Sequence, residues 1–122
     1  MEIKKHHFNG SEIAEVISTE LIIQNTEDAL DLMGNLYYQG YDKIILHRKN
    51  ITPGFFDLKN KMAGEILQKF SNYRVRLVIV GDFLGGTSQS LKDFIYESNK
   101  GKQVNFLSST GEALKSLSFN RN

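Results

Sequence analysis

The amino-acid sequence predicts a single layered α/β domain with a mixed, mostly parallel sheet, an N-terminal β-hairpin and about four helices. Three observations lead to this expectation. Residues on either side of Asn9-Gly10 alternate with a period of two, and farther along short apolar runs alternate with segments of helical periodicity. A length of 122 residues is typical of one domain, so we expect residues 1–122 to fold as one unit.

The hairpin is predicted to pair residues 3–8 with residues 12–18. Asn9-Gly10 joins the two arms and suits a type I′ turn, because both central residues of that turn need a positive φ. Leu21-Ile22-Ile23 predicts a short third extended piece. Strands that alternate with helices after this point favour parallel pairing, so the hairpin should form an antiparallel edge.

The first helix should begin after Asn25, whose side chain can cap it, and end at Gly40, which can take a left-handed conformation. Tyr37 and Tyr38 are neighbours on this helix. Because adjacent helical side chains point about 100° apart, we expect one tyrosine in the core and the other near the surface. Exposed aromatic side chains of this kind are favoured at protein interfaces.

Two strand–helix units follow. Lys43–His47 and residues 75–80 are short apolar runs typical of buried parallel strands. Between them, Thr52 is predicted to cap a helix that has Pro53 at its first position and ends near Ser71-Asn72. We expect the two strands to lie side by side, with their carboxyl ends facing one groove.

The last part of the chain contains two more helices and a strand. Thr87 or Ser88 should cap the first of these helices, and residues 103–106 predict a strand near the edge of the sheet. Ser109-Thr110-Gly111-Glu112 is a capping box that predicts the start of the last helix. The tail Asn120-Arg121-Asn122 is expected to fray.

Composition narrows the classes of function. Fifteen Lys and Arg residues against fourteen Asp and Glu residues leave a formal charge of +1, so no basic excess favours nucleic acid. No apolar run is long enough for a signal peptide or a membrane span, and we expect a cytoplasmic protein with no membrane partner. The absence of cysteine excludes disulfides, thiolate nucleophiles and Cys-ligated zinc. We expect no catalytic residues, metal or cofactor.

The stretch VGDFLGGTSQSLKDF, residues 80–94, is the part of the sequence most similar to a functional motif. It lacks the lysine and the spacing of a P-loop and the Gly-x-Gly-x-x-Gly of a dinucleotide-binding turn. Its backbone amides and the cap at Thr87 or Ser88 could receive an anion at a helix start. The alternative, which we favour, is a mobile glycine turn followed by an ordinary helix cap.

In open α/β sheets, ligands usually bind beyond the carboxyl ends of the strands. In this position His47 could act as a general base, Arg48 could hold a carboxylate or phosphate, and Asp82 could orient a ligand. Each of these also has a structural explanation, such as a hydrogen bond to the backbone. The candidate residues for a ligand or partner are His47, Arg48, Asn50, Thr52, Asp57, Asp82, Thr87 and Ser88.

Three functions are compatible with these candidates. We expect a regulatory or protein-interaction module that recognises a protein partner or a second copy of the chain. The alternative is a sensor or carrier for a small anionic ligand, using Arg48 and the amides before Ser88. The third is a small hydrolase or isomerase with His47 and Asp82 as its polar pair, although no nucleophile-plus-base signature accompanies them.

Two stretches resemble a bacterial group, the domain-of-unknown-function family 4180. They are LMGNLYYQGYDKIILHRKNITPGFFDLKNKMAGEILQKFSNYRVRLVIVGDF and SLKDFIYESNKGKQVNFLSSTGEALKSL. The resemblance covers nearly the whole chain and is clearest over residues 30–117. It implies no particular activity.

More distantly, the layout is similar to SpoIIAA-type or STAS domains, which also have an initial hairpin and helices after the parallel strands. The resemblance implies regulation by phosphorylation of a serine at the start of the helix after the third main strand. The corresponding segment here is residues 50–57, in which Thr52 provides the only hydroxyl group. The Asp-Ser pair of that switch is missing, so the likeness bears on the fold more than on regulation.

Overall fold

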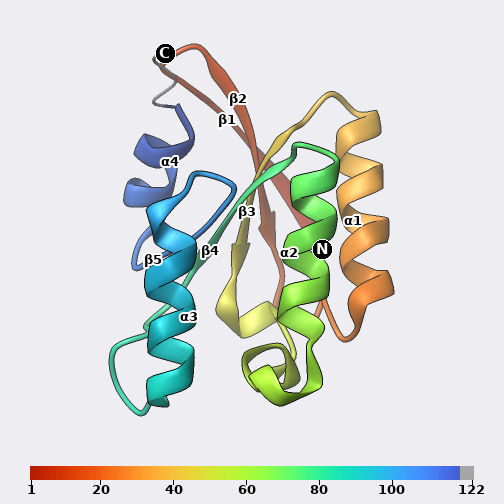
Figure 1. Cartoon of the computed structure of the whole chain (residues 1–122). Coiled ribbons are helices and arrows are strands. Elements are labelled where there is room, and N and C mark those ends of the chain that lie inside the picture. Colours follow the sequence, from red (N-terminus) through yellow and green to blue (C-terminus); the bar gives the residue numbers. More distant parts are fainter. Residues whose placement is uncertain (119–122) are drawn as a thin grey trace.

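The computed structural model of the chain describes residues 1–118; residues 119–122, which include the tail expected to fray, lie outside the described part. One five-stranded sheet has the order β1-β2-β3-β4-β5 (Figure 1). No helix within residues 1–118 has the length and apolarity needed to cross a membrane. The strands are β1 (Glu2–Phe8), β2 (Ser11–Ile17), β3 (Lys43–His47), β4 (Arg76–Val80) and β5 (Val104–Leu107), and the α-helices are α1 (Thr26–Tyr38), α2 (Met62–Asn72), α3 (Gln89–Lys100) and α4 (Thr110–Ser118).

The pairing of the strands confirms the predicted mixed sheet. β1 and β2 are antiparallel, and each later pair of neighbours is parallel. β3 and β4 lie side by side, with Ile45 opposite Val78 and His47 opposite Val80. Their carboxyl ends therefore meet at the same end of the sheet, and β5 forms the edge opposite the hairpin, both as predicted.

Each face of the sheet packs against different helices. α1, α2 and α3 cover one face, where the sheet contributes residues such as Ile44 and Leu77 to the larger core cluster. α4 covers the opposite face, where Ala113 and Leu117 pack against Ile45. Because side chains alternate across a strand, Ile44 and Ile45 enter different clusters.

The turn and cap residues act locally as expected. Asn9 and Gly10 have φ angles of 49° and 82°, as a type I′ turn requires. The side chain of Asn25 accepts a hydrogen bond from the backbone N–H of Asp28 and caps α1. Ser88, rather than Thr87, caps α3.

The helix predicted to begin after Thr52 begins at Met62 instead. Two short 3₁₀ turns precede it, η2 over Pro53–Phe56 and η3 over Leu58–Asn60. The side chain of Thr52 makes no capping hydrogen bond. The prediction of one long helix through this segment was therefore wrong.

Side chain–backbone hydrogen bonds explain the late start of α2. Asp57 accepts from the backbone N–H of Lys59, and Asn60 accepts from that of Met62. Short polar side chains that bond nearby backbone groups compete with helix formation. Lys61 then adopts a left-handed conformation with φ 64°, which separates η3 from α2.

Both tyrosines at the end of α1 are exposed, so the prediction that one would enter the core was wrong. Tyr37 is 57% exposed and Tyr38 is 92% exposed. The buried row of α1 includes Met33 and Leu36, and both tyrosines lie outside it. Tyr41, just after the helix, fills the core in their place.

The capping box before α4 forms, but the side chain of Glu112 bonds Ser108 instead of Ser109. Ser109 Oγ accepts from the backbone N–H of Glu112, as expected. The Glu112 carboxylate bonds both the backbone N–H and the hydroxyl of Ser108 rather than returning to Ser109. These hydrogen bonds, that from the backbone of Ser108 first, lower the pKa of Glu112.

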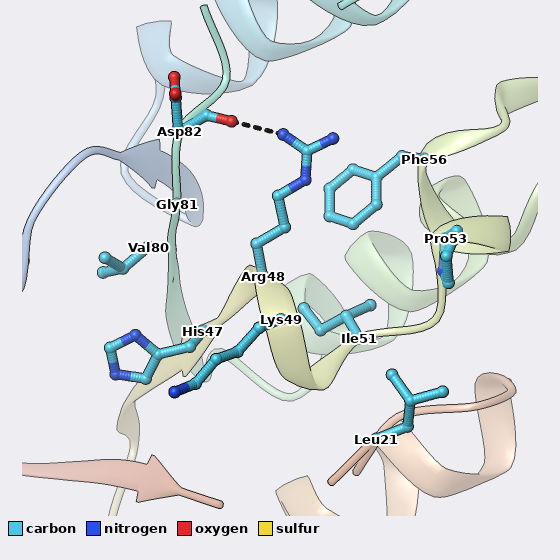
Figure 2. A pocket seen from close by; sticks show the side chains of 10 residues that line it. All are labelled: Leu21, His47, Arg48, Lys49, Ile51, Pro53, Phe56, Val80, Gly81 and Asp82. Carbon is cyan, nitrogen blue, oxygen red and sulfur yellow. Dashed lines mark hydrogen bonds between the residues drawn. The ribbon is translucent and has the colours of Figure 1, made fainter. Parts of the chain in front are cut away.

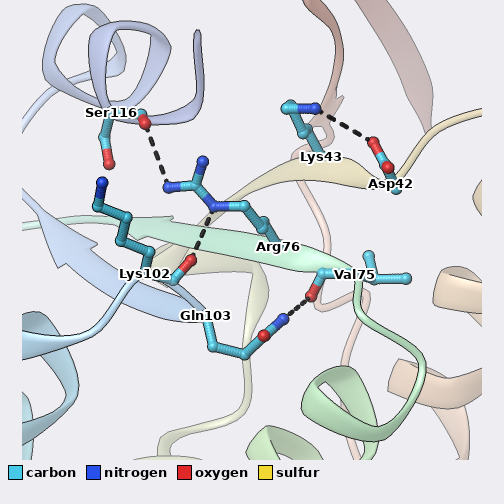
Figure 3. Close-up of polar contacts among 7 residues, drawn as sticks. All are labelled: Asp42, Lys43, Val75, Arg76, Lys102, Gln103 and Ser116. Atoms are coloured by element: carbon cyan, nitrogen blue, oxygen red, sulfur yellow. Dashed lines mark hydrogen bonds and ion pairs between the residues drawn. The ribbon is translucent and has the colours of Figure 1, made fainter. Parts of the chain in front are cut away.

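Polar contacts fasten the elements together at the amino ends of β4 and β5 (Figure 3). Arg76 donates from Nε to the carbonyl of Lys102 at 2.7 Å and from Nη2 to that of Ser116 at 3.1 Å. Gln103 donates from Nε2 to the carbonyl of Val75 at 2.7 Å. These contacts fix α4 and the turn before β5 at the end of the sheet opposite the carboxyl ends of β3 and β4.

Candidate functional site

An open groove with a volume of about 720 Å³ lies at the carboxyl ends of β3 and β4. Figure 2 shows the end of β4 on one side and the short helix η1 (Arg48–Asn50), with the segment that follows it, on the other. The lining residues are Leu21, His47, Arg48, Lys49, Ile51, Pro53, Phe56, Val80, Gly81 and Asp82. Three of the eight sequence-predicted candidates, His47, Arg48 and Asp82, are among them.

Arg48 is held in a defined orientation within this groove. Its guanidinium carbon lies 4.8 Å from the ring centroid of Phe56 and 4.9 Å from that of Phe83. Nη1 donates a hydrogen bond to the carbonyl oxygen of Asp82 at 2.5 Å (Figure 2). Within residues 1–118, Nε and Nη2 have no hydrogen-bond partner. Part of this planar donor group is therefore free to bind a ligand.

Two sequence features bring Arg48 to this position. η1 follows β3 directly, so Arg48 leaves the sheet beside the end of β4. Gly81, the first residue after β4, lies against the Arg48 side chain, and the approach is closer than a Cβ at residue 81 would permit. The rings of Phe56 and Phe83 are 6.0 Å apart and come from segments on either side of the groove.

The charged groups of the groove are mostly cationic. Arg48 and Lys49 contribute two positive charges, and Asp82 contributes one carboxylate. Oδ1 of Asp82 accepts the backbone N–H of Leu84 at 3.1 Å, so this side chain stabilises the turn after β4. The remaining lining is largely apolar, which suits a ligand that has both an anionic and an apolar part.

His47 has a carboxylate partner that we did not predict from the sequence. Its Nε2 lies 2.6 Å from Oε2 of Glu15, and the other carboxylate oxygen of Glu15 lies 2.7 Å from Nε2 of His6. Glu15 is 5% exposed. Its burial raises the pKa, but the hydrogen bonds and charges of His6 and His47 outweigh burial, so the pKa is lower than usual.

A sequence signal for Glu15 did exist. Glu15 is the one charged residue in the run Ile13–Val16 of β2, whose other residues are apolar. A buried carboxylate needs partners. The partners could not be chosen from the sequence, because His6 and His47 lie 9 and 32 residues away along the chain.

Asn50 has a structural role under the groove. It is 1% exposed, and its Nδ2 donates to the carbonyls of Ser18 and Glu20 at 2.9 and 2.8 Å. The backbone carbonyl of Asn50 accepts hydrogen bonds from the backbone N–H groups of Ile22 and Ile23. Asn50 therefore fixes the segment that brings Leu21 to the groove. Its Oδ1 has no hydrogen-bond partner among the described residues.

The other four predicted residues lie outside the groove lining. Asp57 accepts from the backbone of Lys59, and Ser88 caps α3, so both stabilise local turns. Thr87 donates to the carbonyl of Phe83, which helps to fix that aromatic residue. Thr52 donates its backbone N–H to the carbonyl of Ile23.

The polar pair considered for catalysis does not form a hydrogen bond. His47 and Asp82 both line the groove, but His47 bonds Glu15 and the Asp82 carboxylate bonds the backbone of Leu84. Across residues 1–118, no group of three His, Asp or Glu side chains has a geometry that could hold a metal ion.

Fold and groove together define a small α/β domain with a partly cationic groove at the carboxyl ends of its parallel strands. The family model described as "Domain of unknown function (DUF4180)" matches residues 8–117. The chain therefore belongs to this family. Comparisons with curated proteins and with solved structures found no match.

Proposed function

We propose that this protein binds a small anionic ligand with an apolar or aromatic part in the groove at the carboxyl ends of β3 and β4. The observation that carries the proposal is the Arg48 guanidinium, which lies against the rings of both Phe56 and Phe83. An arginine held in this way loses little conformational entropy when it forms further hydrogen bonds, because its plane is already fixed.

The geometry suits a carboxylate or phosphate. A guanidinium pairs with these groups through parallel hydrogen bonds, and Nε and Nη2 of Arg48 have no partner among the described residues. Lys49 adds a second positive charge. Leu21, Ile51 and Pro53 offer apolar contacts for the rest of the ligand.

Isothermal titration calorimetry with benzoate, phenyl phosphate and inorganic phosphate tests the proposal. We expect phenyl phosphate to bind more tightly than inorganic phosphate, because its ring contacts the apolar lining. Benzamide, which is uncharged, should not bind measurably. Arg48→Gln should weaken phenyl phosphate binding by about tenfold or more, since hydrogen bonds to charged groups contribute about 1.5–3 kcal/mol.

Two further variants distinguish a specific role for Arg48 from a general effect of charge. Arg48→Lys keeps the charge but loses the planar, stacked donor group, and we expect it to bind weakly. Arg74→Gln removes an exposed arginine outside the groove and should leave affinity unchanged. Equal losses in Arg48→Gln and Arg74→Gln, or no binding of any of the three anions, would contradict the proposal.

Recognition of a protein partner or of a second copy is the second candidate function. Tyr37, Tyr38 and Tyr73 are 57%, 92% and 59% exposed, and Tyr37 and Tyr73 line a smaller hollow of about 320 Å³ beside Gly34. Exposed tyrosines are enriched at interfaces. Light scattering over a range of concentrations tests self-association, and Tyr38→Ser should reduce it. A monomer at every concentration would contradict association between copies.

Regulation of the type implied by the STAS resemblance remains a prediction. It would act through Thr52, whose hydroxyl makes no capping hydrogen bond and which immediately precedes the groove residue Pro53. A phosphate on Thr52 would add negative charge close to the cationic groove. Thr52→Glu would then be expected to weaken anion binding, whereas unchanged affinity would count against such regulation.

A further inference from the structure

Glu15, His6 and His47 form one polar cluster across three neighbouring strands. His6 is on β1, Glu15 on β2 and His47 on β3. Each carboxylate oxygen of Glu15 accepts from a different imidazole, at 2.7 Å from His6 and 2.6 Å from His47. The Glu15 side chain is 7% exposed, whereas those of His6 and His47 are 17% and 23% exposed. Solvent can therefore reach the histidines, while the carboxylate is buried beneath them.

The protonation states within this cluster follow from the hydrogen bonds. An ionised carboxylate can only accept, so Nε2 of both histidines must carry the hydrogen. The proton acceptor of each neutral imidazole is then Nδ1. Within residues 1–118, Nδ1 of His47 makes no hydrogen bond. This nitrogen is free to take up a proton, and the carboxylate of Glu15 would stabilise the resulting imidazolium.

The charges around His47 come from each neighbouring element. β1 contributes His6 and also Lys4, which is opposite Glu15 in the strand register. η1 contributes Arg48 and Lys49, and Figure 2 shows Lys49 extending to the same side of η1 as His47. On β4 the neighbour in register is the apolar Val80, after which Gly81 and Asp82 follow. α4 packs against the same face of the sheet through the apolar residues Ala113 and Leu117.

We propose that His6, Glu15 and His47 act as a proton-linked unit that couples anion binding in the groove to the uptake of a proton by His47. This inference rests on the proposed function, because it concerns the same groove. His47 lines the groove beside Arg48 and Lys49. An anion bound there stabilises the imidazolium form, and by linkage the protonated form binds the anion more tightly. His6 shares the carboxylate, so its protonation changes the hydrogen bond available to His47.

Calorimetry with benzoate near neutral pH tests the coupling, because benzoate does not titrate there. The titration is repeated in buffers of different ionisation enthalpy. A plot of the observed binding enthalpy against the ionisation enthalpy of the buffer has a slope equal to the number of protons taken up. We expect uptake of a fraction of one proton, with affinity falling by at most about tenfold for each unit rise in pH. His47→Gln and Glu15→Gln should reduce the uptake. His7→Gln, which changes an exposed histidine on the other face of β1, should retain it.

The outcomes separate the inference from the proposed function. Benzoate binding without proton uptake would overturn the coupling and leave the anion-binding groove intact. If benzoate does not bind, the same measurement is made with phenyl phosphate. The protons that phenyl phosphate itself takes up or releases on binding are then subtracted from the measured number. The absence of binding by both probes would overturn the proposed function and the coupling together.

A measurement without any ligand tests the cluster itself. Ring nitrogen chemical shifts of the free protein should identify the tautomer with hydrogen on Nε2 for His6 and His47. His6→Gln should move the titration midpoint of His47, whereas His7→Gln should not. An identical His47 titration in wild type and His6→Gln would overturn the proposal that the three residues act as a unit.

Discussion

Gly81 lies directly against the side chain of Arg48, so that a Cβ at residue 81 would be 2.7 Å from the Arg48 Cβ and 3.2 Å from its Cδ. Real side chains do not approach one another this closely. The contact joins the end of β4 to η1 and places the arginine where Phe56 and Phe83 can stack on it. Glycine at this position is therefore part of how the groove is built.

Gly81→Ala should destabilise the protein by about 1–3 kcal/mol, because Arg48 or the backbone must move to accept the added methyl group. The same shift should weaken binding of phenyl phosphate. Urea denaturation gives the free energy of unfolding, and calorimetry gives the affinity. Gly85→Ala is the matched control: a Cβ there meets nothing within 4 Å, so we expect a change below about 0.5 kcal/mol. Equal effects of the two substitutions would contradict the role given to Gly81.

Glu15→Gln should change how stability depends on pH. The pKa of Glu15 is lowered in the folded protein, so in acid the unfolded chain binds more protons at this residue than the native state does. The stabilisation by its ionised form is complete above the ordinary glutamate pKa of about 4.3 and is lost as the pH falls through the folded value. We therefore expect a steeper acid loss of unfolding free energy in wild type than in Glu15→Gln.

Denaturation curves at a series of acid pH values measure this difference. Glu12→Gln serves as the control, because Glu12 is an exposed carboxylate on the same strand that bonds His7. It should follow the wild-type pH dependence more closely than Glu15→Gln does. Parallel curves for wild type and Glu15→Gln would contradict a lowered pKa of Glu15 in the folded protein.

Asn50→Ala should lower the free energy of unfolding by about 1–3 kcal/mol, because two buried hydrogen bonds to the carbonyls of Ser18 and Glu20 are lost. The segment that carries Leu21 should also loosen, and hydrogen exchange of the Ile22 and Ile23 amides should speed up. Asn35→Ala, at an exposed position of α1, is expected to leave stability nearly unchanged. Unaltered exchange in Asn50→Ala would argue against this anchoring role.

Asn99→Ala should expose the edge of the sheet at β5. The Asn99 side chain accepts the backbone N–H of Phe106 at 2.8 Å and donates to its carbonyl at 3.0 Å, as a neighbouring strand would. An unpaired edge strand is a template for association. We expect Asn99→Ala to self-associate at lower concentration in light scattering than Lys92→Ala, an exposed substitution on the same helix. Identical scattering of the two variants would contradict this protective role.

The sequence alone determined the order of strands and helices, the hairpin at Asn9-Gly10 and the cap at Asn25, and it narrowed the cap of α3 to Thr87 or Ser88. These features depend on residue spacing and on hydrogen bonds between a side chain and backbone groups a few residues away. A short stretch of sequence therefore contains the information that specifies them. It also placed His47, Arg48 and Asp82 at one end of the sheet, because the carboxyl ends of adjacent parallel strands meet there.

Only the tertiary structure decided which side chains meet. The bonds of Glu15 to His6 and His47 follow from the register of three strands, which no local pattern specifies. The packing of Arg48 against both Phe56 and Phe83 likewise joins segments that are distant in the chain. The late start of α2 arose because hydrogen bonds of Asp57 and Asn60 outweighed an apolar periodicity that continued through them.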